Sequence, residues 1–535
     1  MRAPRLTGWA AALALLLSAL PGAALAAVPS GDTLPSAGTQ AADARTAPVA
    51  DTRQGRVQGS SVAGADRFAG IPYAAPPVGS LRWKPPAPPA AWNGVRPATA
   101  FGSQCPQQTG GSEDCLSLNV YRPQNRPSVG LPVMVWLHGG AYVSGAGSEY
   151  DPTPLVTGGG VLVVTINYRL GMLGALALPG LDAEAPATGS GAYSLLDQQA
   201  ALRWVRQNIR GFGGDPGNVT VFGESAGATY ACQQVVSPLA KGLFHAAIAQ
   251  SGCALPTTPM ARAQSFGTAV AAQLGCASDL ACLRAASPDQ INSAAATVGG
   301  SPNATQLASI PAAGGGVLPR GFGDALRAGQ YNHVPLALGS NLDEGRGFVH
   351  SGAYGDPPTD QASYVAALTR TATLSSGIPA ADIAQEYPLS AYPSPAEAFS
   401  AVLGDSSFSC RTLNANRLAK GRLPVHAYEF TDPDAPSLFG GSSLGATHGS
   451  ELAYLFRMPG TAQLTQAQQT LSRQMIGYWT SFARNHTPMA SGTPPWPRFT
   501  GSRPPIQNLA PDAIGPVSST AFAAEHHCAF WNPAI

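Results

Sequence analysis

Two runs of consecutive apolar residues, at 133–137 and 161–166, constrain the fold of this 535-residue chain most strongly. Both runs are rich in β-branched side chains, which is typical of strands buried on both faces of a parallel sheet. Further along the chain we expect a helix at 195–209 and a strand at 219–222. A second helix is expected from Ser225 onward, and a second strand around 246–249. This alternation predicts an α/β fold with a large, mostly parallel central sheet flanked by helices. Residues from about 255 to 400 carry weaker helical patterns, so we expect helices above the sheet there.

Composition and charge exclude two classes of protein. The chain has 31 basic and 30 acidic residues, so it lacks the positive charge of a nucleic-acid-binding protein. Its hydrophobic fraction of 44% supplies a sizeable core, which excludes disorder over the whole chain.

The first 26 residues have the pattern of a secretory signal peptide. Arg2 and Arg5 precede an apolar stretch at 9–20, and a small-residue cleavage site follows at 24–26. An uncleaved membrane anchor is the alternative, but the apolar stretch is shorter than the roughly 20 residues that span a bilayer. We expect a flexible linker at 27–50, a folded domain at 51–535, and a secreted or periplasmic protein without stable membrane association.

Eight cysteines fit an oxidising compartment, and they are Cys105, Cys115, Cys232, Cys253, Cys276, Cys282, Cys410 and Cys528. Eight thiols allow 105 pairings, so the count alone assigns none of them. Their spacing is not that of a zinc site, and the nearest approach to one is the run 526–528, His-His-Cys. We therefore expect no metal.

A Gly-Glu-Ser-Ala-Gly segment at 223–227 lies directly after a predicted strand and before a predicted helix. In that setting G-x-S-x-G forms a strained turn that exposes the serine hydroxyl at a helix N-terminus. A second segment, His-Gly-Gly-Ala at 138–141, follows the strand at 133–137, from where its backbone N–H groups could bind a carbonyl oxygen. A capping serine and an ordinary glycine turn are the alternatives, and the two motifs together favour Ser225 as a nucleophile.

Together with these motifs, the segments 68–77, 112–120, 167–171, 212–216 and 528–532 resemble the type-B carboxylesterase/lipase family, which includes cholinesterases and fungal lipases. The resemblance covers residues 50–532. It implies an α/β-hydrolase fold, with helical excursions over the active site, and hydrolysis of carboxylic esters through an acyl-enzyme without a cofactor.

The resemblance also implies roles for particular residues. The family acid lies in a D-E-G segment, here 343–345, and the base in an H-G segment, here 448–449. Glu344 would then orient His448, which takes the proton of Ser225, and Asp343 is the competing acid. The implied oxyanion donors are the N–H groups of Gly140, Ala141 and Ala226. Since His448 must be neutral to act as a base, activity should rise with an apparent pKa of about 6 to 7.

The family pattern pairs six of the cysteines, as Cys105–Cys115, Cys276–Cys282 and Cys410–Cys528. It gives no pairing for Cys232 and Cys253. We expect these two to be free buried thiols, with a fourth disulfide as the alternative.

Departures from the family pattern bear on the substrate. Ala192 and Ser194 replace the usual Asn and Gly, and the segment 311–315 lacks an expected acidic residue. The loop between Cys105 and Cys115 has only nine residues, none of them aromatic. In lipases of the family this loop is a lid, and in cholinesterases it carries the tryptophan that stacks on choline.

We therefore expect an open gorge, a preference for short-chain or aromatic esters, no interfacial activation and no special affinity for choline esters. Trp83 and Trp92 lie in a proline-rich segment that is typical of a structural role. An esterase dedicated to one natural-product or toxin ester, like the fumonisin esterases of the family, is the alternative. A non-catalytic binding protein is the alternative from another class, although such relatives typically lose triad residues.

Overall fold

The structure is a computed structural model that describes residues 47–124, 130–253, 255, 257–300, 302–371, 377–440 and 443–531. The expected signal peptide and nearly all of the expected linker lie outside these residues. The linker prediction is wrong at its end, because Val49 and Ala50 belong to strand β1 (Val49–Thr52). This strand pairs with β2 (Gly55–Gln58), which pairs in turn with β5 (Val95–Pro97), so the folded part begins earlier than expected.

Within the described residues, one sheet of eleven strands forms the centre of the molecule, in the order β16-β15-β14-β13-β10-β9-β7-β8-β6-β4-β3. The neighbours from β15 to β8 are parallel, and antiparallel strands complete both edges. The bounds are β3 (Ser60–Val62), β4 (Ala65–Pro72), β6 (Ser117–Pro123), β7 (Leu131–Leu137), β8 (Leu162–Ile166), β9 (Gly214–Glu224), β10 (Ala246–Gln250), β13 (Leu336–Asn341), β14 (Val425–Phe430), β15 (Pro505–Leu509) and β16 (Gly515–Ser518). The predicted, mostly parallel sheet is confirmed.

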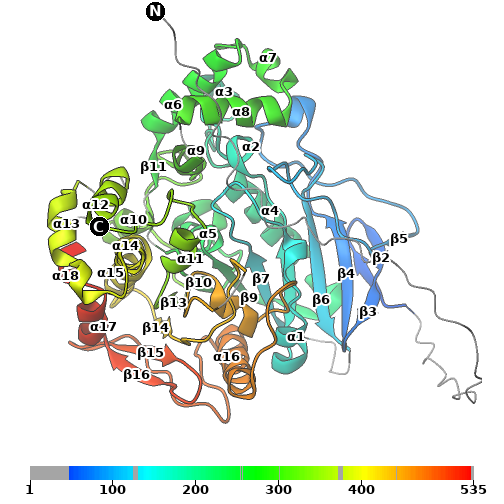
Figure 1. Ribbon diagram of the computed structural model, residues 1–535. Helices are drawn as coiled ribbons and strands as arrows, with labels where there is room; N and C mark the ends of the chain where they lie inside the picture. The colour runs from blue at the N-terminus through cyan, green and yellow to red at the C-terminus, as the bar shows by residue number, and fades with distance from the viewer. Residues whose placement is uncertain are drawn as a thin grey trace, which may run out of the picture.

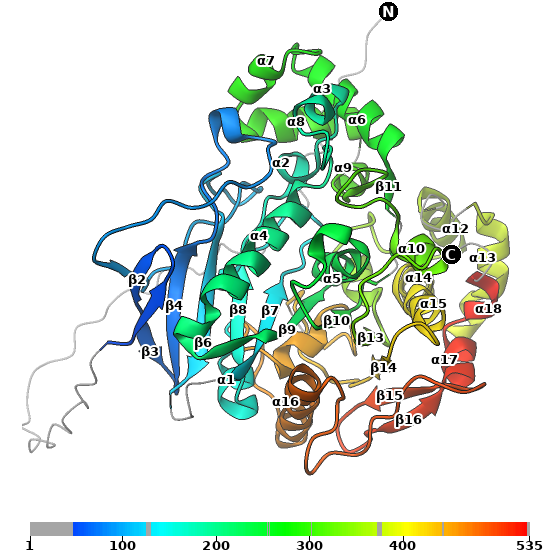
Figure 2. The same ribbon diagram turned by 180° about the vertical axis from the view of Figure 1, so that it is seen from behind.

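Alternate residues of the central strands enter two different cores. In β7, Val133, Val135 and Leu137 face one core, whereas Met134 and Trp136 face the other. Helices α4 (Tyr193–Asn208) and α5 (Ala226–Val236) cover the first face, which lies in front in Figure 2. Helices α1 (Thr153–Gly159) and α16 (Gln466–Asn485) cover the second face, toward the viewer of Figure 1. Burial on both faces explains why these strands have no polar alternation.

Most of the region from 255 to 400 is helical, as expected. Helices α6 (Met260–Gln273), α7 (Leu280–Ala285) and α8 (Pro288–Gly299) gather with α3 (Pro179–Glu184) at the top of Figure 1. The remaining helices of the region are α9 (Pro302–Ala308), α10 (Phe322–Arg327), α11 (Arg346–His350), α12 (Gln361–Arg370), α13 (Ala380–Glu386) and α14 (Pro395–Gly404). The region also contains the central strand β13, which was not expected. Its sequence, Leu-Ala-Leu-Gly-Ser-Asn, has no β-branched residue, and parallel pairing with β10 and β14 holds it in the sheet.

The chain ends in elements that pack against the edge of the sheet near β14 and β15. A π-helical turn (Asp405–Ser409) joins α14 to α15 (Cys410–Ala419), and α17 (Ser519–Glu525) and α18 (Cys528–Trp531) close the described chain. In Figure 1 the red C-terminal helices lie beside the yellow helices α12 to α15.

All eight cysteines are paired. The three disulfides implied by the family pattern are present, and a fourth joins Cys232 to Cys253. The expectation of two free thiols is therefore wrong. Helix α5 packs on β10, which brings Cys232 close to the residues that follow this strand, with the two Cα atoms 5.7 Å apart. Among the described helices, none is long and apolar enough to cross a bilayer.

Candidate active site

Ser225 lies at the sharp turn between β9 and α5. Its backbone has φ 57° and ψ −123°, a strained conformation for a residue with a side chain. The turn needs its flanking glycines, because a Cβ atom on Gly227 would lie 1.9 Å from the carbonyl oxygen of Leu137. A Cβ atom on Gly223 would lie 2.5 Å from the carbonyl carbon of Gly227. Between Val221 and Tyr230, Ser225 is the one residue that is not buried, so the turn leaves it partly exposed.

The segment 138–141 passes directly beside this turn, since a Cβ atom on Gly139 would lie 3.2 Å from Cβ of Ser225. Positive φ angles at Gly140 (104°) and Ala141 (53°) turn the chain there. Within the described residues, no hydrogen bond uses the backbone N–H groups of Gly140, Ala141 or Ala226. The structure thus brings three unused donors to the neighbourhood of Ser225.

The side chains of Glu344 and His448 are in direct contact. Glu344 Oε2 lies 2.5 Å from His448 Nδ1, and Glu344 Oε1 accepts a hydrogen bond from the N–H of Asn341 (2.8 Å). Glu344 is fully buried and His448 is 7% exposed. Asp343, the competing acid, turns the other way and accepts a hydrogen bond from the N–H of Ala446. Glu344 is therefore the carboxylate that can orient His448.

Glu224, the middle residue of the serine motif, also faces His448. Its Oε1 lies 3.0 Å from His448 Nε2, without the alignment of a hydrogen bond. Ser225 Oγ makes no hydrogen bond with His448 among the described residues. Such contacts are often long in enzymes without substrate. The chain neighbour of Ser225 thus reaches the imidazole, and the sequence reasoning missed this role of Glu224.

Glu224 belongs to a buried group of carboxylates. Glu451 is fully buried and accepts hydrogen bonds from Gln250 Nε2 (2.9 Å) and Asn341 Nδ2 (2.6 Å). Trp479 Nε1 donates to Gln250 Oε1 in turn (3.0 Å). Glu451 follows His448 by only three residues, and this spacing is the feature of the sequence that could have placed Glu451 near the site.

These carboxylates change the protonation of the site. Burial raises the pKa of Glu224 to about 8, an effect that His448 opposes and the negative charges of Glu451 and Glu344 increase. Burial alone would lower the pKa of His448, but the charges of Glu224 and Glu344 outweigh it and raise this pKa to about 9. Both groups thus tend to keep their protons near neutral pH, and the proton on Nε2 must leave before His448 can act as a base.

Aromatic rings form the wall around His448. The ring centres of Phe348 and Phe408 lie 4.9 Å and 4.6 Å from that of His448. Phe439 packs 5.6 Å from Phe348. The imidazole is thus packed against apolar rings on one side and charged groups on the other.

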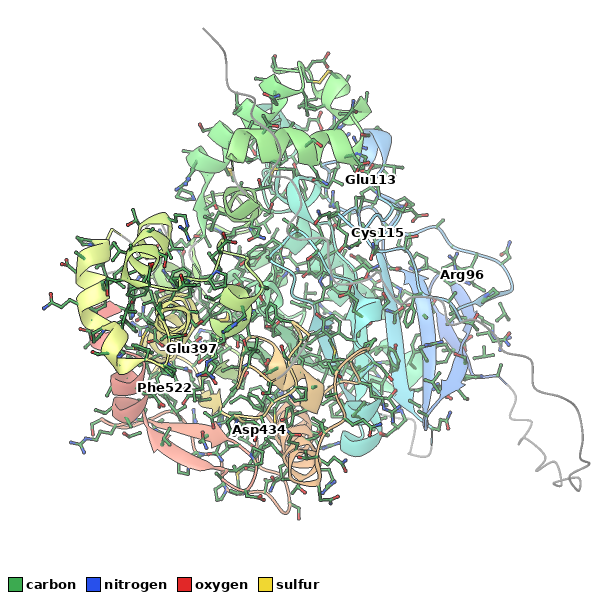
Figure 3. The ribbon with its side chains drawn as sticks, in the orientation of Figure 1. Arg96, Glu113, Cys115, Glu397, Asp434 and Phe522 are labelled. Carbon is green, nitrogen blue, oxygen red and sulfur yellow. A yellow bond between two sulfur atoms is a disulfide. The ribbon has the colours of Figure 1, made fainter. Side chains whose placement is uncertain are left out.

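The short loop between Cys105 and Cys115 contacts the segment that follows β7. Gln107 Oε1 accepts from the N–H of Gly145 (2.9 Å), and Gln107 Nε2 donates to the carbonyl of Gly145 (3.1 Å). Cys115 marks the end of this loop in Figure 3. The loop is therefore bound to the chain that carries Gly140 and Ala141.

The two candidate tryptophans are structural. Trp83 is 1% exposed and donates to the carbonyl of Met172, whereas Trp92 donates to the carbonyl of Arg56 in the N-terminal sheet. Among the described residues, neither forms a hydrogen bond or a ring interaction with Ser225 or His448. Of the two departures near residue 193, Ser194 donates to the carbonyl of Arg169, beside the buried ion pair of Arg169 with Asp197.

The His-His-Cys run at 526–528 does not offer a thiolate, because Cys528 is in a disulfide. His526 lies instead between two carboxylates, Asp405 and Glu429, with Nδ1 2.6 Å from Asp405 Oδ1 and Nε2 2.6 Å from Glu429 Oε1. Zinc ligands stand about 2.0–2.2 Å from a shared metal and hence more than 3 Å from one another. A proton, not a metal, therefore fits between the imidazole and each carboxylate.

Comparison with known proteins identifies the family. The family model described as "Carboxylesterase family" matches residues 46–531. The chain belongs to the carboxylesterase family. It is 36% identical to a fumonisin B1 esterase of Sphingopyxis macrogoltabida over 479 residues, which cover 84% of each chain. It is also 36% identical to a human cocaine esterase over 532 residues, which cover 91% of each chain.

Solved structures agree with this assignment. A PNB esterase superposes with a TM-score of 0.76 at 35% identity, covering 90% of this chain and 100% of the other. The predicted α/β-hydrolase fold and the resemblance to the type-B carboxylesterase/lipase family are confirmed. This carboxylesterase is a carboxylic ester hydrolase, which sets aside the interpretation as a non-catalytic binding protein.

Proposed function

We propose that this carboxylesterase cleaves its ester substrates with Ser225 as nucleophile, His448 as general base and then general acid, and Glu344 as the group that orients His448. The observation that carries the proposal is the 2.5 Å contact between Glu344 and His448, next to the strained turn that presents Ser225. The three unused N–H groups of Gly140, Ala141 and Ala226 would bind the oxyanion of the tetrahedral intermediate.

The steps follow from these positions. Ser225 Oγ attacks the ester carbonyl carbon while His448 Nε2 takes its proton, and Glu344 stabilises the imidazolium that results. His448 then gives the proton to the leaving alcohol, which leaves an acyl group on Ser225. Water attacks this acyl-enzyme with His448 again as base, and the carboxylic acid leaves. None of these steps draws on a cofactor.

We infer a preference for short-chain or aromatic esters. The nine-residue loop between Cys105 and Cys115 is held against the segment after β7 and is too short to form a lid. The rings of Phe348 and Phe408 beside His448 suit a flat aromatic or small acyl group. Dedication to one natural-product ester remains the second candidate, which the likeness to the fumonisin B1 esterase favours. The equal identity to a human cocaine esterase does not favour it, and a panel of esters graded by acyl length would separate the two.

We further propose that the protein is secreted or periplasmic through the signal peptide at 1–26. The four disulfides fit an oxidising compartment and support this assignment. N-terminal sequencing of the mature protein from the producing cell tests it, and a chain that still begins at Met1 would contradict it.

Two neighbouring carboxylates provide a matched test of the proposed triad. Glu344→Gln should lower kcat for p-nitrophenyl acetate by about 10³- to 10⁴-fold, because the amide cannot hold and stabilise the imidazolium. Asp343→Asn changes a carboxylate paired with Arg346 instead, and should leave kcat within about threefold. Equal losses in the two variants would overturn the assignment of Glu344.

A further inference from the structure

Besides His448, a second buried histidine lies among charged groups, and the proposed catalytic steps do not use it. His526 is 2% exposed and contacts a carboxylate with each ring nitrogen, Asp405 Oδ1 at Nδ1 and Glu429 Oε1 at Nε2. A ring that donates to a carboxylate from both nitrogens must carry both protons, so His526 is an imidazolium. Burial works against this charge, but the two carboxylates outweigh it and raise the pKa of His526 well above its usual value.

The three groups come from separate parts of the fold. Asp405 begins the π-helical turn, Glu429 lies in β14, and His526 follows α17. Asp405 Oδ2 accepts a hydrogen bond from the hydroxyl of Tyr387 (2.8 Å), and Trp531 Nε1 donates to that same hydroxyl (2.6 Å). The C-terminal segment is therefore linked to Asp405 twice, directly by His526 and indirectly by Trp531 through the hydroxyl of Tyr387.

The disulfide Cys410–Cys528 binds the same two segments at the other end of the turn, since Cys410 directly follows Ser409. The ring centre of Phe522 in α17, labelled in Figure 3, lies 4.5 Å from that of His526. The π-helical turn is thus attached to the C-terminal segment at its first residue, Asp405, and at Cys410, which follows its last residue. Such turns within helices are often found at functional sites.

The turn carries a residue that touches the candidate base. Phe408 lies within it, and its ring centre is 4.6 Å from that of His448. Phe408 also stacks on Phe348 at 5.9 Å, and Phe348 is itself 4.9 Å from His448. A displacement of the turn would therefore change the apolar wall that holds the imidazole of His448.

Charge balance couples the proton of His526 to the position of the turn that carries Asp405. Without the second proton of its ring, His526 would be neutral between two buried carboxylates, with the exposed Glu525 beside them. Such unpaired buried charges are strongly unfavourable, and moving the turn that carries Asp405 is the direct way to separate them.

We propose that His526 is a positioning residue of this esterase: by bridging Asp405 and Glu429 it holds the π-helical turn in place, and the turn holds Phe408 against His448. The inference rests on the proposed role of His448 as the base. It gives the C-terminal segment a part in catalysis without contact to the substrate.

The test compares His526→Gln with Phe408→Ala and with the double variant, using the whole mature enzyme and p-nitrophenyl acetate. His526→Gln should lower kcat by about 10- to 100-fold with little change in KM, because a small misplacement of a catalytic group is costly. It should also move the pH at which kcat/KM rises. Phe408→Ala should reproduce both effects, and the double variant should be no worse than the more damaged single variant.

The neighbouring pair of His527 with Glu386 supplies the matched control, since it is the same kind of contact (2.7 Å) on a partly exposed side chain. His527→Gln should leave kcat and the pH profile unchanged. If His526→Gln does not fold, Asp405→Asn removes one carboxylate with almost no change in shape, and should still shift the pH profile. Active sites are counted with a fluorophosphonate, so that a loss of folded enzyme is not taken for a loss of kcat.

A folded His526→Gln with the wild-type kcat and pH profile would overturn the proposal, and so would effects of His526→Gln and Phe408→Ala that multiply. Both results would leave the inactivity of Ser225→Ala and His448→Gln intact. If those two variants were active, the proposed function itself would have failed instead.

Discussion

At the scale of single residues, the geometry of the site depends on the different directions in which the side chains of neighbouring residues point. Asp343 and Glu344 are neighbours in the chain, yet one pairs with Arg346 and the other is buried against His448. Glu224 and Ser225 are likewise neighbours, and Glu224 is the one whose side chain lies 3.0 Å from His448 Nε2. Protonation of this small group of residues therefore governs when the base is available.

The pH dependence of activity is expected to follow from these charges. His448 must be neutral to act as a base, so kcat/KM should rise as pH increases through its pKa. The carboxylates of Glu224 and Glu344 raise the pKa of His448, so the apparent pKa should lie above 6.5 and not at the value expected from the sequence. Glu224→Gln removes one negative charge at nearly constant shape, and should move the rise to lower pH by about one unit. A rise that does not move in this variant would contradict the coupling of the two groups.

At the scale of elements, the structure depends on contacts between segments that are remote in sequence. The strands at 133–137 and 161–166 could be predicted, because burial on both faces makes them continuously apolar. Strand β13 could not, since it contains no β-branched residue and its neighbours in the sheet stabilise it. The serine turn was predictable from its glycines, whereas the contacts of Phe408 and His526 depend on packing between the π-helical turn, β14 and the C-terminal segment.

The unexpected disulfide gives a prediction about stability. Cys232 and Cys253 close a loop with a sequence separation of 21, so Cys232→Ala/Cys253→Ala should lower the free energy of unfolding by about 3 kcal/mol. Urea unfolding under non-reducing conditions measures the change. Cys276→Ala/Cys282→Ala is the control, with a smaller expected loss because its sequence separation is only 6. Recovery of Cys232 and Cys253 as free thiols in a non-reducing peptide map would contradict the pairing.

At the scale of the whole molecule, the family, the fold and the ester chemistry were predictable, because the motifs that define them are local in sequence. The described chain shares its architecture with PNB esterases over nearly its full length. The substrate preference was harder to predict from the sequence, since it depends on which side chains and loops surround His448 once the chain is folded. The short loop between Cys105 and Cys115 is the exception, because its length is visible in the sequence and its attachment through Gln107 is seen in the fold.

This loop leads to a prediction about substrates. Because nine residues cannot form a mobile lid, the rate on tributyrin should rise smoothly through its solubility limit, without a jump at the appearance of the emulsion. Since Trp83 and Trp92 are engaged elsewhere, butyrylcholine should be cleaved no faster than an uncharged butyrate ester. A sharp increase at the emulsion threshold would indicate a lipase, and a marked preference for the choline ester would indicate a cholinesterase.

The central claim is that Ser225 forms the acyl-enzyme, and covalent labelling tests it most directly. A fluorophosphonate probe should modify the wild-type enzyme once, on the peptide that contains Ser225, as mapped by mass spectrometry. Ser225→Ala should lose both the label and the hydrolysis of p-nitrophenyl acetate, by at least about 10³-fold, while remaining folded. The control is Ser251→Ala, which should keep both the label and the activity. Ser251 is a buried serine beside the turn, and its hydroxyl has no hydrogen-bond partner among the described residues. Labelling at another residue, or a folded Ser225→Ala that retains more than about one hundredth of the wild-type turnover, would contradict the account.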